Sequence, residues 1–491
     1  MSFIHRTFGD LTVKASRLQV MLSMSLASHP LGRFIPNPFL QGGFAPVRDE
    51  LTVDDLPVRG TIPPELDGVY LRNGPNPAYK PISYMYPFDG DGMVHALRLR
   101  GGCAAYRNRF VLTAGLRAER RAGRALYGGV AIPHPVDPAL IGPDGDPNPI
   151  KNTANTNIIR HAGRIFALWE GGPPTELDAG LQTIGPYDFG GRLPNAFTAH
   201  PKIDPATGEM LGFRYAGCAP YLMFSVIDAA GGFVREVPLR MDAGFMVHDF
   251  AITERHAVFF LCPVVVDIEG AMHGGRLLDW QPARGTRIAV LPRDGDGPVR
   301  WFDADPFFVF HFMNAHEQDG RIAVDYVQHA GFGRASGPPP SLWRMELDLA
   351  AGTARRTQLH DRSAEFPRVD PAFEGRSNRY GWSLVRGAVR GRPGTFTALA
   401  RYDLGGGDMA IHDFGGGQEV DEPVFIPRPG ASQEDAAQEA GGWIGAYVYD
   451  HACDASRFVL LDAIDIQAPP IAEISLPRRV PHGFHGNWMA S

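Results

Sequence analysis

The sequence predicts an all-β fold, and three observations lead to this prediction. Beyond about residue 50, short runs rich in β-branched and aromatic residues alternate with Gly, Pro, Asn and Asp as far as the C-terminus. The chain contains 58 glycines and 43 prolines, which would interrupt long helices too often. Strand and helix patterns do not alternate, so a parallel α/β sheet is not expected.

Several runs have the length and composition of strands. The clearest are Arg164–Trp169, His256–Val266, Arg321–Gln328, Trp443–Tyr449 and Arg457–Ile466. A long chain of short strands must protect its sheet edges, and a propeller of radially packed four-stranded sheets does this. The residues show no clean repeat period, so by themselves they do not give the number of blades.

Helical segments are expected only near the N-terminus and in inserted loops. The apolar stretch Leu18–Leu26 has helical spacing and is interrupted by serines, which favours an amphipathic helix over a signal peptide. It is too short to cross a bilayer, which takes roughly 20 residues, so it lies either in a membrane interface or against the fold. The polar loops His134–Pro149 and Ser432–Gly441 do not resemble interdomain linkers. We therefore expect a helical segment over residues 1–45 and a single β-propeller domain over residues 46–491.

Composition excludes several classes of protein. Hydrophobic residues make up 44% and charged residues 21%, as in ordinary globular proteins. The net charge is −7 and no block of Lys or Arg is present, which argues against a nucleic-acid partner. The four cysteines are far apart with no CxxC pair, a pattern typical of a reducing compartment, and we expect a cytoplasmic protein.

Four histidines are candidates for one shared metal site. His200, His248, His311 and His485 each lie in an apolar or glycine-bracketed run with little charge nearby. Their separations of 48, 63 and 174 residues exclude a compact zinc finger. A common site would therefore have to be assembled by a large closed fold that brings distant strands together.

Nine blocks of sequence, in order from about residue 45 to the C-terminus, resemble the carotenoid cleavage oxygenase family. They are Phe88–Met93, Asn152–Asn157, Ala167–Glu170, His200–Met210, Met246–Glu254, Phe310–Glu317, Glu365–Arg368, Glu422–Arg428 and Val480–Gly486. The resemblance implies a seven-bladed β-propeller capped by a dome of loops and short helices. It also implies one non-haem Fe(II) on the propeller axis.

The resemblance assigns roles to particular side chains. The family's iron ligands match His200, His248, His311 and His485, whereas the neighbouring histidines His316 and His482 do not fit a ligand position. Four neutral imidazoles would leave the ion its full charge and, in an octahedral arrangement, two open positions, which suits O₂ activation better than structural zinc.

Three glutamates match the family's outer partners of the ligands, namely Glu170, Glu365 and Glu422. A ligating imidazole usually donates its second N–H to such a group. The alternative is an ordinary solvated glutamate at a blade edge, which the block around Glu422 would favour if it stood alone; together the blocks favour the partner role for all three. The family pattern leaves the ligand that matches His200 without a carboxylate partner.

The implied chemistry is oxidative cleavage of a carbon–carbon double bond by O₂ into two carbonyl products, with no organic cofactor. A hydrophobic tunnel would hold the alkene beside the iron. The candidates for its lining are Phe88, Trp169, Phe310, Phe312 and Phe484. Packing in the propeller core is an equally good explanation for any one of these aromatic residues.

The predicted substrate is a carotenoid or apocarotenoid. Stilbene-cleaving relatives grip a phenol with a lysine just before the glutamate that matches Glu170 and with a tyrosine aligned near Val130, but here the lysine position is Trp169. The alternatives are a phenylpropanoid alkene such as a hydroxystilbene or isoeugenol, and a propeller that binds without turnover. Members of the polyene branch insert an N-terminal apolar patch into membranes, and Leu18–Leu26 matches it. The sequence specifies neither the bond cleaved nor the oligomeric state.

Overall fold

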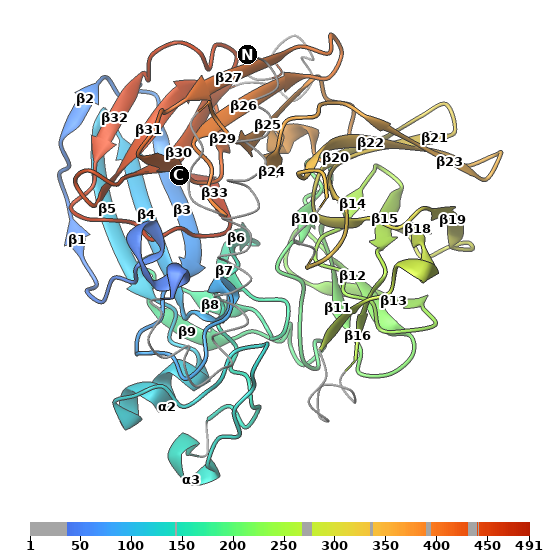
Figure 1. Cartoon of the computed structure of the whole chain (residues 1–491), viewed down its shortest axis with the longest axis horizontal. Coiled ribbons are helices and arrows are strands. Elements are labelled where there is room, and N and C mark those ends of the chain that lie inside the picture. The colour runs from blue at the N-terminus through green and yellow to red at the C-terminus, as the bar shows by residue number, and fades with distance from the viewer. Residues whose placement is uncertain are drawn as a thin grey trace, which may run out of the picture.

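The predicted seven-bladed β-propeller is confirmed. The computed structural model describes residues 37–142, 145–267, 277–333, 337–388, 394–430, 439 and 441–491. In these residues, seven sheets of four or more strands follow one another around the molecule in chain order, and a two-stranded sheet is appended to one of them (Figure 1). The expected helix at Leu18–Leu26 lies outside the described residues, as does most of Ser432–Gly441.

The first and last blades are built from both ends of the chain. The first has the order β1-β5-β4-β3-β33, with β1 Thr52–Val53, β3 Asp67–Pro75, β4 Gly92–Arg100, β5 Cys103–Phe110 and β33 Gly486–Ala490. The last has the order β2-β32-β31-β30-β28, with β29 also paired to β30. Its strands are β2 Val58–Gly60, β28 Gln418–Val420, β29 Val424–Pro427, β30 Gly442–Asp450, β31 Ala455–Asp462 and β32 Ala472–Ser475.

Two exchanged strands close the ring. The C-terminal strand β33 pairs with β3 in the first blade, and the N-terminal strand β2 pairs with β32 in the last. Backbone hydrogen bonds therefore join one strand from each end of the chain to a blade formed largely by the other end, which closes the ring.

The five intervening blades are formed from consecutive segments of the chain. The second holds β6 Asn157–His161, β7 Arg164–Leu168, β8 Thr175–Leu177 and β9 Thr183–Pro186; the third holds β10 Lys202–Ile203, β11 Met210–Tyr215, β12 Tyr221–Ile227 and β13 Phe233–Arg240. The fourth holds β14 Ala251–Ile252, β15 His256–Leu261, β18 Thr286–Pro292 and β19 Arg300–Ala304, with β16 Val264–Val266 and β17 Leu278–Trp280 appended. The fifth holds β20 Phe308–Gln318, β21 Arg321–His329, β22 Ser341–Asp348 and β23 Thr353–Gln358; the sixth holds β24 Ala364–Arg368, β25 Tyr380–Val385, β26 Ala398–Asp403 and β27 Met409–Asp413.

The strands follow the hydrophobic pattern of the sequence with small differences. β5 alternates buried and less buried residues, as a strand with one covered face should, whereas β30 is buried on both faces between two neighbouring blades. The expected strand His256–Val266 is divided into β15 and β16 around Pro263, because proline has no N–H to donate to the ladder. Hydrophobic clusters fill the spaces between adjacent blades.

Helices are few and lie mainly at one end of the molecule (Figure 1). The α-helices of the described residues are α2 Ala114–Ala122 and α3 Pro138–Ile141, the latter within the expected loop His134–Pro149. Short 3-10 turns cover Pro38–Leu40, Gly42–Phe44, Pro87–Asp89, Pro282–Arg284 and Pro371–Phe373. None of the helices in the described part of the chain is long and apolar enough to span a bilayer.

We did not predict α2, although its end signals are present in the sequence. The Thr113 side chain accepts a hydrogen bond from the Leu116 N–H at the start, and Gly123 ends the helix with a φ of 66°. A buried ion triad attaches this helix to the first blade, since Lys151 Nζ lies 2.5 Å from both Asp91 Oδ1 and Glu119 Oε2. Helix α2 is thus anchored to the first blade by charge as well as by packing.

The close approach of two glycines at the inner end of β3 leads to a prediction about stability. A Cβ on Gly74 would lie 2.5 Å from the Cα of Gly483, where neither backbone can yield easily. We expect Gly74→Ala to lower the free energy of unfolding by about 1–3 kcal/mol, as overpacking does in cores.

Thermal and urea denaturation will measure this effect. Gly217→Ala is the matched control, because a Cβ on Gly217 would have nothing within 4 Å, and it should change stability by less than about 0.5 kcal/mol. Equal midpoints for the two variants would contradict the proposed close contact.

Candidate metal centre

The inner ends of four blades bring four histidines together. His200 precedes β10, His248 precedes β14, His311 lies within β20 and His485 precedes β33. Each offers a ring nitrogen, and these nitrogens all lie within 4.8 Å of one another. The structure therefore assembles the set that the sequence spacing alone could not place.

Two of the nitrogens that face the centre lie within hydrogen-bond distance of each other, and a third has no partner. The Nε2 atoms of His200 and His248 are 3.0 Å apart, and the Nε2 of His311 is buried without a hydrogen-bond partner. An imidazole nitrogen buried without a partner is costly unless a cation accepts its lone pair. The donor set thus fits a metal ion that accepts nitrogen ligands.

Three carboxylates hold the outer nitrogens of three of these rings. Glu170 Oε2 lies 2.7 Å from His248 Nδ1, Glu365 Oε2 lies 2.6 Å from His311 Nδ1, and Glu422 Oε1 lies 2.8 Å from His485 Nδ1. A carboxylate can only accept, so each Nδ1 donates and each Nε2 is left for the centre.

His200 is held by its backbone instead. In the described part of the chain, no carboxylate forms a hydrogen bond with the His200 ring. The backbone N–H of His200 donates to Thr198 Oγ1 at 3.0 Å. The Asn157 side chain donates to the Ala199 carbonyl at 2.8 Å, and Lys202 pairs with Asp249, the residue after His248, at 3.0 Å. The segments that carry two of the histidines are thereby tied together.

Burial and neighbouring charges set the protonation of the rings. Burial lowers the pKa of His200 well below its usual value, and the three neighbouring imidazoles lower it further. Burial also lowers the pKa of His485 to about 4, against the opposing effect of Glu422. Burial acts in the same direction on His248, but Glu170 outweighs it and raises the pKa of that ring. Two of the rings are therefore firmly neutral, as metal ligation requires.

The buried carboxylates keep their charge because cations and N–H groups surround them. Burial alone would raise the pKa of Glu422, but Arg368, His485 and Arg72 lower it to about 2. Its second oxygen accepts the Gly486 N–H at 2.8 Å. Burial would likewise raise the pKa of Glu365, yet His311 and His329 hold it well below its usual range.

The predicted aromatic residues separate into two groups. Phe88 and Phe484 stack at 5.4 Å, and Phe484 adjoins His485; Phe310 packs edge-on against His248 at 5.6 Å. Phe312 packs instead against Phe260 at 4.9 Å in the hydrophobic cluster of the fourth and fifth blades. The contacts of Phe312 are therefore those of a core residue, the alternative given above for each of these aromatic residues.

Trp169 and Val130 lie beside other predicted site residues. Trp169 directly precedes Glu170 and is partly buried. The Val130 N–H donates to Asp89 Oδ1 at 2.8 Å, so the loop aligned with the tyrosine of stilbene-cleaving relatives is fixed next to Phe88.

The two histidines that we set aside do not join the cluster. His316 lies in β20 opposite Ala323, outside the four-histidine group. His482 is buried between two carboxylates, with Nδ1 2.8 Å from Asp421 and Nε2 2.8 Å from Glu419. It fastens the segment that leads into His485.

Sequence analysis missed three residues around the centre. Phe366 has a positive φ of 53° and stacks on His311 at 5.1 Å, while its N–H donates to Glu365 Oε2 at 2.8 Å. Arg368 donates to the Gly486 carbonyl at 2.9 Å. His329 bonds Glu365. The first two stand in the EFPR block and could have been suspected there, whereas nothing near His329 in the sequence marks it.

A family model and a curated relative both match nearly the whole chain. The model of the family described as retinal pigment epithelial membrane protein matches residues 44–490. The carotenoid 9,10(9',10')-cleavage dioxygenase 1 of Phaseolus vulgaris is 33% identical over 493 residues, covering 92% of this chain and 89% of the relative.

Two solved structures have a similar fold. The lignostilbene dioxygenase of Pseudomonas brassicacearum gives a TM-score of 0.85 at 33% identity, covering 93% of this chain and 100% of that one. A cobalt-substituted apocarotenoid oxygenase from Synechocystis gives a TM-score of 0.82 at 32% identity, covering 91% and 98%.

The geometry of the four histidines predicts stoichiometric metal binding. After anaerobic reconstitution with Fe(II) or Co(II) and desalting, we expect about one equivalent per chain. His485→Ala should weaken the affinity by at least about 100-fold, since even the loss of an outer partner typically costs 10–100-fold. Metal analysis and calorimetry will measure both quantities.

His316→Ala is the control for this loss, because it removes a histidine from the same strand as His311 but outside the cluster. Metal binding by His485→Ala at the wild-type level would exclude this histidine as a ligand.

The buried His482 pair predicts a pH dependence of stability. Burial would lower the pKa of His482, but Asp421 and Glu419 outweigh it and raise it to about 9. Because the folded pKa exceeds the unfolded value of about 6.5, the stabilisation is complete below that pH and is lost as pH rises through about 9. The Tm difference between wild type and His482→Gln should therefore shrink in alkaline buffer.

Melting curves between about pH 6 and pH 10 will test this, with His316→Gln as the control for removing a histidine. A Tm difference that stays constant over this range would show that His482 is not held as a cation.

Proposed function

We propose a function on the premise that this chain belongs to the carotenoid cleavage oxygenase family, the family of the retinal pigment epithelial membrane protein. We infer that it is a non-haem iron dioxygenase that cleaves one double bond of a carotenoid or apocarotenoid. The observation that carries the proposal is the buried cluster of four imidazoles with three carboxylates on its outer side.

In this proposal His200, His248, His311 and His485 hold one ferrous ion, and Glu170, Glu365 and Glu422 orient three of the ligands. A metal bound by neutral imidazoles alone keeps its full charge and supplies the binding and activation of O₂ at positions that the protein leaves open. The likeness to the cobalt-substituted Synechocystis protein supports a divalent metal. The identity of the ion as iron comes from the family resemblance.

The reaction balances without an organic cofactor. One C=C bond and one O₂ molecule give two C=O groups, so no external electron donor is required. The protein's own contribution is to position the alkene and to exclude water from the centre. Apolar and aromatic side chains do both for a polyene, because its chain offers few groups for hydrogen bonding.

The aromatic residues beside the centre support a polyene as the substrate. Phe484 and Phe310 pack next to His485 and His248, and Phe88 extends this surface outward, being 44% exposed. We assign these residues and Trp169 to the substrate tunnel and leave out Phe312. Trp169 and Val130 stand where stilbene-cleaving relatives carry the lysine and the tyrosine that grip a phenol.

The alternative substrate is a phenylpropanoid alkene such as a hydroxystilbene or isoeugenol. The likeness to the lignostilbene dioxygenase of Pseudomonas brassicacearum favours it. The apolar residues at the two phenol-gripping positions argue against it. We therefore keep the polyene as the first choice.

We further propose a cytoplasmic enzyme that collects its substrate at a membrane surface. Free cysteines, three of them exposed, suit a reducing compartment. Polyenes partition into bilayers, and Leu18–Leu26 is the candidate for a peripheral contact.

Product analysis will test the proposed function. Iron-loaded protein is incubated separately with a panel of carotenoids and apocarotenoids in detergent and with a hydroxystilbene, and the aldehydes are identified by mass spectrometry. We expect aldehydes from the polyenes, with masses that report the cleaved bond. Aldehydes from the stilbene alone would overturn the substrate assignment.

Trp169→Lys extends this test to the tunnel wall. We expect kcat/KM for the polyene to fall by at least about 10-fold, because a charge would be placed against an apolar chain. Trp169→Phe, which keeps an aromatic wall, should retain most of the activity. Unchanged turnover by Trp169→Lys would remove Trp169 from the site.

A further inference from the structure

One of the three outer carboxylates carries a second histidine. Glu365 lies in β24 and places Oε2 2.6 Å from His311 Nδ1, while its Oε1 lies 2.6 Å from the Nε2 of His329. His329 is the last residue of β21 in the neighbouring blade. The carboxylate thus bridges two imidazoles, only one of which belongs to the four-histidine cluster.

The direction of both hydrogen bonds follows from the charge of the carboxylate. Each oxygen of Glu365 has one imidazole nitrogen 2.6 Å away, and a carboxylate can only accept from such a ring. His329 Nε2 and His311 Nδ1 therefore both donate. With its Nδ1 committed, His311 must present Nε2, the nitrogen that has no other partner, to the centre.

Two of the three carboxylates, Glu422 and Glu365, differ in what restrains them. Glu422 is flanked by Arg72 at 3.5 Å and Arg368 at 3.8 Å. Glu365 has no arginine or lysine partner among the described residues, and His329 is its one polar side-chain partner besides His311. The imidazole of His329 takes the place that guanidinium groups occupy at Glu422.

His329 is itself held in place by aromatic packing. Its ring meets Phe310 edge-on at 5.3 Å and Phe308 at 6.2 Å, and β21 pairs with β20 through Phe308 and His329. Phe310 also packs against His248. A ring enclosed in this way has little freedom to leave Glu365, so the bond is pre-organised.

We propose that His329 is a positioning residue for the metal centre: its Nε2–H fixes one oxygen of Glu365 so that the other holds His311 with Nε2 directed inward. The inference rests on the proposed function and adds a residue to it. His329 is not one of the four clustered histidines, and it packs against Phe310 of the proposed substrate wall; its effect on the centre passes through Glu365.

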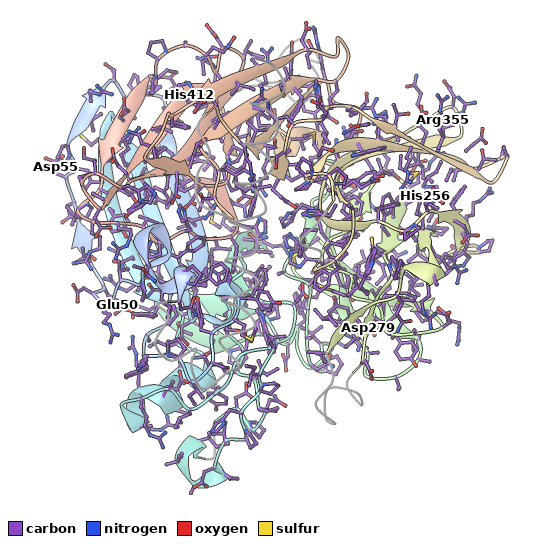
Figure 2. The ribbon with its side chains drawn as sticks, in the orientation of Figure 1. Glu50, Asp55, His256, Asp279, Arg355 and His412 are labelled. Carbon is purple, nitrogen blue, oxygen red and sulfur yellow. The ribbon has the colours of Figure 1, made fainter. Side chains whose placement is uncertain are left out.

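The test compares three variants with wild type. His329→Leu removes the donor, and His329→Asn is polar but too short to reach Glu365. His329→Gln can place an N–H near the position of Nε2. The matched control is His256→Leu, which breaks a similar histidine–glutamate bond, from His256 Nδ1 to Glu317 Oε1 at 2.8 Å, on the outer part of the molecule (Figure 2).

The control is matched in exposure as well as in chemistry. The side chains of His256 and His329 are 17% and 19% exposed, and both pair with a largely buried glutamate. Replacing either histidine with leucine should therefore lower the Tm of the metal-free protein by a similar amount. Of these variants, only His329→Leu and His329→Asn should differ from wild type in metal binding.

Metal binding provides the decisive measurements. The affinity for Co(II) is measured by competition with a chelator, and the visible spectrum of the Co(II) protein reports the ligand field. We expect His329→Leu and His329→Asn to bind Co(II) about 3–10-fold more weakly, less than the 10–100-fold typical of a direct outer partner, with an altered spectrum. His329→Gln should restore both, and with iron the loss of activity should appear in kcat rather than KM.

Each outcome has a distinct meaning. If His329→Leu and His329→Asn match His256→Leu in Co(II) affinity and spectrum, His329 is only a packing residue and the inference is wrong. If wild type itself binds no Co(II), the proposed function fails and the inference fails with it. If His329→Leu does not fold, His329→Asn and His329→Gln still decide the question, because one lacks the reach and the other keeps it.

Discussion

Hydrogen bonds from imidazole N–H groups to carboxylates are the interactions on which the centre of this protein depends. An isolated imidazole can turn either nitrogen toward a cavity. Here Glu170, Glu365 and Glu422 each accept from an Nδ1 at 2.6–2.8 Å, which fixes the tautomer and leaves Nε2 facing inward. The position of the carboxylates therefore decides which lone pairs converge.

Buried carboxylates need partners of their own, and these partners connect the site to the propeller. Glu422 lies between Arg72 of the first blade and Arg368 of the sixth, and Arg72 also approaches Asp421, the partner of His482. An unpaired charge in this position would cost several kcal/mol. The ion network thus ties three neighbouring blades together around one end of the axis.

The sequence predicted the strands and the four histidines well, because both depend on local pattern and on family blocks. β7, β21 and β30 fall within a residue or two of their expected bounds. Contacts that depend on how one blade faces the next could not be predicted. His329 meets Glu365 only because the end of β21 lies beside β24 (Figure 1), and no local pattern encodes that distance. The sequence likewise left open whether Phe312 lines the site or packs in the core, and its packing against Phe260 depends on how two blades face each other.

Closure of the ring and assembly of the centre are the same structural event. His485 immediately precedes β33, the strand that completes the first blade, and the His485 N–H donates to the Thr156 carbonyl in the segment leading into the second. If β33 leaves β3, one of the four imidazoles leaves with it. A metal ion that binds the complete set must therefore stabilise the closed ring by mass action, in proportion to the logarithm of its concentration over Kd. The strand that closes the propeller and the ligand that completes its centre thus stabilise each other.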